Sequence, residues 1–376
     1  MCKKIFIAAT GQHCGKTTIS LSLMHLARKR YRRVGFIKPL GPKPTMYQGR
    51  LMDKDAALTA EVYDLNDDLD CMSPVVVQQG TTKQVLEGRL CAEAMRDSIF
   101  SAVEELERRC DFLIIEGAGH GGVGSVVGLN NAQIARMLNT PVVMVSGGGI
   151  GNVIDHVTLN LALFEREGAD VRLLLANKLI ADKRQQTLDY LRRAFADQPM
   201  HIAGGFNFSP ILANPTLGRI SRLLKTPLQG DQDQYNRILH NVQLGAASSQ
   251  RVADLLKDST LLIVTSSRDE LLVMLSSLYH LPEYRKKLAG LVIPGSTEMS
   301  KITKQILDES RIPYLRIPGT TAATFAAIKD DVSKITPQDD EKIHLIRTLS
   351  ETELDFATID RCLNPSPGRK KAVALA

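Results

Sequence analysis

The residues best suited to chemistry lie near the start of the chain, where a lysine and a threonine follow a glycine-containing turn. Residues 5–9 form an apolar run typical of a buried strand, and Gly15-Lys16-Thr17 opens a helical pattern after the turn. Backbone N–H groups at a helix N-terminus bind anions, a lysine there reaches the outer phosphates, and a threonine hydroxyl ligates Mg²⁺. This order predicts a phosphate-binding loop for a nucleoside triphosphate.

The loop is a variant of the usual pattern, because Thr10 stands six residues before Lys16, where a glycine is usual, and Gly11 follows it. The alternative is an ordinary strand–turn–helix with a chance Gly-Lys-Thr sequence. A strand before and a helix after are the context that the motif requires, and they favour nucleotide binding. The predicted nucleotide-contacting residues are Thr10, Gly11, Gln12, His13, Cys14, Gly15, Lys16, Thr17 and Thr18.

Polar residues also end or follow other predicted strands. Lys38, Glu116 and Asn177 end strand-like runs, and Asp55 opens the helical segment after Lys38. Ligands bind at the carboxyl ends of parallel strands, so these side chains are expected around one crevice. Asp55 and Glu116 with the Thr17 hydroxyl would make an oxygen-ligand site for Mg²⁺. Lys38 would bind a phosphate or an anionic substrate, although each residue alone could equally be a helix cap or an exposed strand end.

The elements that must position these residues alternate between strand-like and helical patterns over the first 205 residues. Several of the strands are apolar on both faces, as in Phe112-Leu113-Ile114-Ile115. Such strands predict an α/β fold with a mainly parallel sheet buried between helices on both faces. The predicted strands are 4–9, 34–38, 111–116, 141–146, 171–177 and 201–206.

A second, smaller α/β pattern follows a Pro/Gly-rich stretch at about residues 210–230. It predicts strands at 239–244, 261–265, 288–293 and 314–317. We expect a first domain at residues 1–208, a linker at 209–235, a second domain at 236–355 and a disordered tail at 356–376.

Composition excludes some classes of protein. The 376 residues have a net charge of +6, but the excess of cations is local, at the end of the first helix and in the tail. Trp is absent and aromatic residues make up 5%, which disfavours a base-stacking nucleic-acid surface. The six cysteines lack paired metal-ligand spacing. With no signal-peptide pattern and no apolar run near ~20 residues, we expect a cytoplasmic protein without membrane or nucleic-acid partners.

One glycine-rich stretch matches a different nucleotide motif. Residues 117–122, Gly-Ala-Gly-His-Gly-Gly, follow a strand in the spacing of a dinucleotide-binding fingerprint. The next helix is predicted only near Asn130, and no acidic residue ends the following strand, so a loop that closes over the nucleotide is favoured. His120 in it could act as a general acid or base, or could simply be a polar loop residue.

Several of these stretches together resemble dethiobiotin synthetase, an ATP-dependent ligase of the phosphate-loop class. The similar stretches are 10–18, 35–39, 55–56, 116–119 and 176–178. The chain departs from that family at Ala9, His13 and His120, so the ATP half of the site is kept better than the substrate half. The resemblance implies that Lys16 and Thr17 bind phosphate and Mg²⁺, that Asp55 and Glu116 help to hold the metal, that Asn177 reads adenine, and that Lys38 contacts the reacting substrate.

The chain as a whole resembles the N-terminal region of long bacterial phosphotransacetylases, in which a domain like dethiobiotin synthetase precedes a small α/β module of the DRTGG type. The Asp-Arg-Thr-Gly-Gly signature is not present as such. The acyltransferase domain would have to follow residue 355, so this chain is not expected to be a phosphotransacetylase by itself.

The resemblance favours a regulatory or sensor protein that binds ATP and Mg²⁺ and acts on a metabolite or a partner enzyme of acetyl-phosphate metabolism. An ATP-dependent ligase acting on a small carboxylate or amine is the alternative, and an interaction protein with a relic loop is a third. A homodimer is expected by resemblance.

Overall fold

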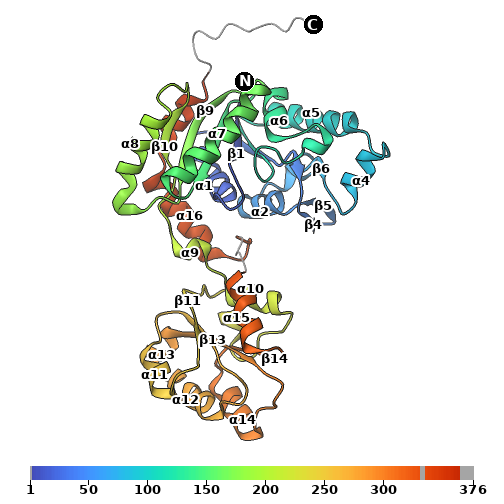
Figure 1. Ribbon diagram of the computed structural model, residues 1–376. Helices are drawn as coiled ribbons and strands as arrows, with labels where there is room; N and C mark the ends of the chain where they lie inside the picture. Colours follow the sequence, from blue (N-terminus) through green and yellow to red (C-terminus); the bar gives the residue numbers. More distant parts are fainter. Residues whose placement is uncertain (1, 331–334, 365–376) are drawn as a thin grey trace, which may run out of the picture. The chain divides into compact units, whose positions relative to one another are not determined.

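The computed structural model describes residues 2–330 and 335–364. Within these residues the chain forms two compact units, one made of residues 2–208 and 344–364 and the other of residues 209–330 and 335–343 (Figure 1). Across the described ranges, none of the helices is both long and apolar enough to span a bilayer.

The first unit is built on a six-stranded sheet whose strands are all parallel. Its strand order is β10-β9-β8-β1-β7-β2, so the strand before the phosphate loop is central. The predicted α/β fold and each of its six strands in this unit are confirmed. Their bounds are β1 Lys3–Ala9, β2 Val34–Ile37, β7 Phe112–Glu116, β8 Val142–Gly147, β9 Val171–Asn177 and β10 His201–Gly204.

Helices cover both faces of this sheet (Figure 1). Alternate side chains of a strand point to opposite faces, and both sets are buried in β1: Phe6 and Ala8 pack in a core shared with Ile99 and Val157, while Ile5 lies on the other face. Burial on both faces explains the continuous apolar runs. One face carries α5 (Ala92–Arg109), α6 (Asn131–Met137), α7 (Ile150–Arg166) and α8 (Arg184–Ala194), and the other carries α1 (Lys16–Arg28) and α2 (Lys54–Tyr63).

Between β2 and β7 the chain forms several short strands and helices that the sequence pattern did not predict in detail. Its strands have only two to four residues, too short to show a period. A hairpin and a two-stranded parallel pair lead into and out of α2. The added elements are β3 Leu40–Gly41, β4 Pro44–Tyr47, β5 Arg50–Asp53, α3 Leu69–Met72, β6 Val75–Val76 and α4 Thr81–Leu86.

The second unit has a four-stranded parallel sheet in the order β11-β12-β13-β14. Separate apolar cores lie on its two faces, one with α11 to α14 and the other with α10 and α15. The four predicted strands of this unit are confirmed. The elements are β11 Asn241–Leu244, α11 Ser249–Asp254, β12 Thr260–Ile263, α12 Asp269–Tyr279, α13 Pro282–Lys287, β13 Leu288–Pro294, α14 Lys301–Ser310, β14 Tyr314–Ile317 and α15 Thr321–Asp330.

The predicted linker at 209–235 is instead part of the second unit. It contains α9 (Pro210–Ala213) and α10 (Leu217–Leu224), and Leu217, Ile220 and Leu228 are buried in the core of that unit. Pro and Gly residues interrupt the strand–helix alternation here, but the spaced apolar side chains bury enough surface to hold the segment in place.

The predicted boundary at 355 and the disordered tail also need correction. Helix α16 (Asp340–Glu353) crosses the division between the units at residues 343 and 344, and α17 (Phe356–Cys362) belongs to the first unit. Asp360, 4% exposed, accepts hydrogen bonds from Lys3 Nζ at 2.5 Å and Tyr31 Oη at 2.7 Å. These partners lie more than 300 residues away in sequence, so no local sequence pattern predicts the contacts. Residues 365–376 of the predicted tail lie outside the described residues.

Replacing Asp360 with asparagine is expected to destabilise the first unit by about 1–3 kcal/mol, because Lys3 and Tyr31 lose a charged acceptor in a largely buried setting. Burial alone would raise the pKa of Asp360, but hydrogen bonds from Lys3 and Tyr31 outweigh it and hold that pKa below its usual range. The stabilisation is therefore present above about pH 4 and is lost as the pH falls through the folded pKa. Thermal unfolding at pH 7, with the exposed Asp182→Asn as control, measures it; equal melting of the two variants contradicts the assignment of α17.

Candidate functional site

The phosphate loop lies between β1 and α1, where the fold brings the two neighbouring strands β7 and β8 against it. The Thr10 hydroxyl donates to Ser146 Oγ at 2.8 Å, and the Thr10 N–H donates to the Val145 carbonyl at 3.0 Å. Gly15 has a φ of 93°, in the left-handed region, and precedes Lys16, the first residue of α1. The loop is therefore anchored at its start and turns sharply into the helix.

Asn177, at the end of β9, holds the loop in place. Its side chain is buried, its Nδ2 donates to the Cys14 carbonyl at 2.8 Å, and its Oδ1 accepts from the Phe206 N–H at 2.8 Å. A Cβ at Gly15 would lie 2.3 Å from that Nδ2, so only glycine fits there. The structure thus brings Asn177 to the loop as expected, and both the nitrogen and the oxygen of its side-chain amide bond to backbone groups. Contact of Asn177 with adenine stays a prediction.

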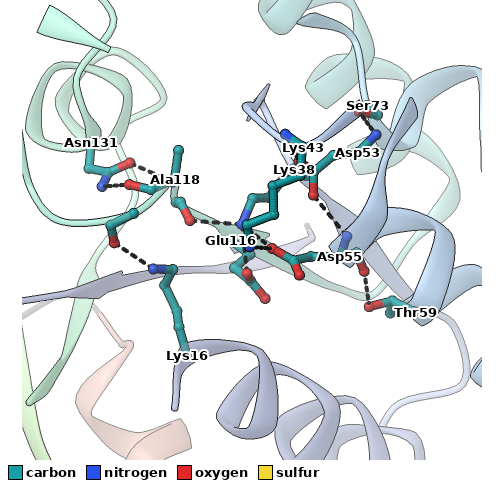
Figure 2. Close-up of polar contacts among 12 residues, drawn as sticks. Lys16, Lys38, Lys43, Asp53, Asp55, Thr59, Ser73, Glu116, Ala118 and Asn131 are labelled. Carbon is teal, nitrogen blue, oxygen red and sulfur yellow. Dashed lines mark hydrogen bonds and ion pairs between the residues drawn. The ribbon is translucent and has the colours of Figure 1, made fainter. Parts of the chain in front are cut away.

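Lys16 reaches across to the loop that follows β7. Its Nζ donates to the Gly119 carbonyl at 2.5 Å (Figure 2). Burial, with the nearby Lys38 ammonium, lowers the pKa of Lys16 to about 8. An ammonium that is partly desolvated and bonded to one neutral carbonyl would form a stronger, charge-assisted hydrogen bond with an anion.

Lys38 lies at the centre of a buried ionic cluster (Figure 2). Its Nζ donates to Glu116 Oε1 at 2.7 Å, to Asp55 Oδ2 at 3.2 Å and to the Gly117 carbonyl at 3.0 Å. Burial alone would lower the pKa of Lys38, but Glu116 and Asp55 outweigh it and raise that pKa. Burial likewise opposes ionisation of Asp55, yet Lys38 and Lys43 hold its pKa well below the usual range. Lys38 is thus a fixed cation and not a base.

Two charged members of this cluster, Asp53 and Lys43, were not predicted. Asp53 is wholly buried at the N-terminus of α2, where its Oδ1 accepts from the Asp55 N–H at 2.8 Å and its Oδ2 accepts from the Lys43 N–H at 2.9 Å. Lys43 Nζ donates to Asp55 Oδ2 at 2.9 Å. Burial and the nearby Asp55 raise the pKa of Asp53. An acidic residue before a helix is an N-cap signal that could have revealed Asp53, whereas nothing in the local pattern marks Lys43.

The glycine-rich loop after β7 is held by Asn131, another residue that was not predicted. Asn131 Nδ2 donates to the Ala118 and His120 carbonyls at 2.7 and 2.8 Å, and its Oδ1 accepts from the Ala118 N–H at 2.9 Å. Helix α6 begins only at Asn131, so the loop does not lead directly into a helix as a dinucleotide-binding fingerprint requires. The exposed His120 lies at the rim of this loop.

The side chains suit a magnesium ion. Glu116 Oε2 is buried and has no hydrogen-bond partner, and the Thr17 hydroxyl makes no hydrogen bond within the described ranges. A carboxylate and a hydroxyl oxygen are ligands that Mg²⁺ accepts alongside phosphate oxygens and water. Over the same ranges, no group of three or more His, Cys, Asp or Glu residues could hold a metal unaided.

A central parallel sheet with a phosphate loop after its first strand is the architecture of α/β proteins of the phosphate-loop class. Residues 3–220 match the family described as an AAA domain, AAA_26, and residues 220–330 match the DRTGG domain. The chain belongs to that AAA domain family and carries a DRTGG domain after it, which confirms the architecture predicted by resemblance.

Curated relatives fall into two groups. The phosphate acetyltransferase of Nitratidesulfovibrio vulgaris is 22% identical over 381 aligned positions, which cover 98% of this chain and 53% of the relative. The ATP-dependent dethiobiotin synthetase BioD of Aromatoleum aromaticum is 27% identical over 206 positions, which cover 53% of this chain and 91% of the relative. The chain thus spans about half the length of the phosphate acetyltransferase.

Among solved structures, a Cyanothece McdA variant in complex with ATP is similar, with a TM-score of 0.38, 13% identity, and coverage of 55% of this chain and 84% of that chain. A structure of the CBS and DRTGG domains of Clostridium perfringens pyrophosphatase has a TM-score of 0.26 and 15% identity, and covers 45% of this chain and 76% of that chain.

Proposed function

We propose that this protein binds ATP with Mg²⁺ at the phosphate loop and serves as a metabolic regulator related to the N-terminal region of phosphate acetyltransferases. The observation that carries the binding proposal is the convergence of Lys16, Lys38 and the unpartnered Glu116 oxygen beside that loop. The ammonium groups of Lys38 and of Lys16, both charged at pH 7, would face the phosphates, and the Glu116 oxygen that lacks a partner among the described residues would face the metal.

Each residue has a defined task in this proposal. Thr17 and Glu116, with Asp55, hold Mg²⁺, which neutralises phosphate charge when it is bound. Lys16 would exchange the Gly119 carbonyl for a phosphate oxygen, and the loop after β7 would lose that contact while Asn131 still holds it. Asn177 keeps the phosphate loop in shape through Cys14 and approaches the adenine.

The regulatory part of the proposal rests on the path of the chain. Helix α16 begins in the residues of the second unit, and its later part contacts the ends of both helices whose first residues form the site. Glu351 accepts from His25 and Lys29 on α1, and Arg347 lies over the Tyr63 ring of α2. A shift of α1 or α2 on nucleotide binding would therefore change the contacts that hold α16. The partner is proposed to be a metabolite or an enzyme of acetyl-phosphate metabolism.

An ATP-dependent ligase is the alternative, and the permanently charged Lys38 favours it. A buried cation that cannot act as a base is suited to stabilise negative charge on an acyl phosphate or a transferred phosphoryl group. In that case a small carboxylate or amine would bind beside Lys38, and a homodimer is the state that the family resemblance predicts.

The two functions predict different turnover. A regulator is expected to hydrolyse ATP slowly, and its rate should change less than about twofold when diaminopelargonate and bicarbonate, or a panel of small carboxylates and amines, are added. ADP release by the full chain, measured with and without each compound, provides the test. In parallel, hydrogen exchange should show altered protection in α16 when Mg·ATP is added.

A rise in ADP release of about tenfold or more with one compound would establish a ligase and reject the regulator. Slow turnover with exchange unchanged in α16 and in the second unit would leave nucleotide binding intact but refute its regulatory role. The matched control is Lys16→Ala, in which the loss of nucleotide binding should abolish the response of α16 to Mg·ATP.

A further inference from the structure

A hollow of about 500 Å³ lies on the helical face of the first unit formed by α5 and α6. Its wall at Gly128 follows the glycine-rich loop in sequence, but its other lining residues are not part of the site described above. Among them are Arg96 and Phe100 from α5, and Arg136 and Met137 from α6. Volumes of roughly 300–1,000 Å³ are typical of sites for small ligands.

Two arginines of the lining, Arg96 and Arg136, are available to a ligand. Both are exposed, and within residues 2–330 and 335–364 neither makes an ion pair or a hydrogen bond. Other arginines of α5 behave differently, since Arg108 and Arg109 both pair with Glu105. The one carboxylate in the lining, Glu167, already accepts from Arg166 at 2.7 Å.

Helix stabilisation accounts for only one of these arginines. Arg136 is in the last turn of α6, where a cation complements the helix dipole. Arg96 is the fifth residue of α5, near the positive N-terminal end, where a cation gains nothing from the dipole. The helix dipole therefore does not explain a guanidinium in that position.

Beside its charged residues and Gln133, the lining has an apolar part and is open at one wall. Phe100 and Met137 are half-buried, and Leu129 is 1% exposed. Gly128 has a φ of 64°, and a Cβ built there meets no atom within 4 Å, so its lack of a side chain leaves free space. Asparagine tolerates this left-handed conformation better than other residues with a side chain, so Gly128→Asn would fill that space with little backbone strain.

We propose that this hollow binds a small organic anion, in which a phosphate or carboxylate group pairs with Arg96 and Arg136 and an apolar body packs on Phe100 and Met137. The guanidinium fork binds both kinds of anion in a bidentate manner, so the two share one chemistry. The site is separate from the phosphate loop, and the inference does not depend on the proposed function.

The test is calorimetric titration of the full chain with phenyl phosphate, benzoate and inorganic phosphate. Phenyl phosphate or benzoate is expected to bind at least about tenfold more tightly than inorganic phosphate, because only they supply an apolar body. The tighter of the two identifies the anionic group. Gly128→Asn, and separately the double variant Arg96→Ala/Arg136→Ala, should weaken that binding at least about tenfold. The matched control with the same change of charge on α5, Arg108→Ala/Arg109→Ala, should not.

Three results would overturn the proposal. Binding that is lost in Lys16→Ala but kept in Gly128→Asn would assign the probe to the phosphate loop. Equal weakening in the two double variants would show attraction to general positive charge only. Absence of binding of both aromatic probes at about 10 mM to a wild-type protein that melts normally would show that the hollow is not a site for this class of ligand.

Discussion

Replacing Lys16 with alanine is expected to weaken the binding of Mg·ATP by about 100-fold or more. The Lys16 ammonium is partly desolvated and has one neutral carbonyl as partner, so a phosphate oxygen offers it a much stronger, charge-assisted bond. Loss of such a bond, worth roughly 3 kcal/mol, corresponds to a factor of about 100 in Kd. Calorimetric titration of both proteins in the presence of Mg²⁺ measures it.

We expect Lys16→Ala to fold normally, so that weaker binding can be assigned to the lost lysine. Among the described residues, the Lys16 Nζ makes a hydrogen bond to the Gly119 carbonyl alone, so replacing Lys16 should change the melting temperature of the free protein little. Arg32→Ala, in which an exposed cation is removed beyond the far end of the same helix, should bind Mg·ATP as the wild type does. An unchanged Kd in Lys16→Ala would refute the assignment of the nucleotide site.

The pH dependence of binding follows from the same lysine. Burial lowers its pKa to about 8 in the free protein, and only the charged form pairs with phosphate. A bound anion raises that pKa, so above pH 8 the protein must take up a proton to bind. Affinity should therefore be nearly constant around pH 7 and fall by about tenfold by pH 9, and this fall should be missing in Lys16→Ala.

How much of the site could be predicted from the sequence depends on how far each signal reaches. Lys38 and Glu116 were placed together correctly, because both end strands of one parallel sheet and the carboxyl ends of such strands meet at one edge. Asp55 was placed because it opens the next helix. Lys43 was missed, since it lies in a stretch of two- to four-residue strands that leaves no period to read.

The fold shows the same limit. Most strands of the two sheets are buried apolar runs, and their period and composition locate them within a few residues. The role of residues 344–364 was mispredicted, because what fixes them is contact across the chain: Asp360 with Lys3 and Tyr31, and the Phe356 ring near Phe112. Pairings so distant in sequence have no local signature, and only the folded chain reveals them.

Replacing Lys38 with methionine is expected to destabilise the first unit by about 3–5 kcal/mol. Lys38 is 1% exposed, and its removal leaves the wholly buried Glu116 without its cation and Asp55 with Lys43 alone. Breaking a buried ion pair by removing one partner strands the other charge in a poorly solvated place. For a unit of this size the melting temperature should fall by roughly 10 °C. Lys287→Met, which breaks an exposed pair with Glu283, should cost less than about 1 kcal/mol.

The double variant Lys38→Met/Glu116→Gln separates the ion pair from simple packing. It removes the stranded charge while keeping the shape of both side chains, so it should recover a large part of the lost stability. If the double variant is no more stable than Lys38→Met, the loss comes from packing and not from the unpaired carboxylate.

The stability of the wild type and the stability of Lys38→Met should depend differently on pH. In the wild type, the depressed pKa of Asp55 gives stability that is present above about pH 4 and lost as the pH falls through the folded pKa. The raised pKa of Lys38 gives stability that is complete below about pH 10 and lost only as the pH rises through its folded pKa. Together they predict a constant contribution between about pH 5 and 9. In Lys38→Met, Asp55 keeps Lys43 as a partner but loses Lys38, so its pKa is lowered less and less stability is lost when that carboxylate takes up a proton. The gap in stability between the two proteins should therefore narrow as the pH falls from about 5 to 3. Denaturant unfolding at both pH values measures that gap, and a gap that stays constant would mean that Lys38 does not lower the pKa of Asp55.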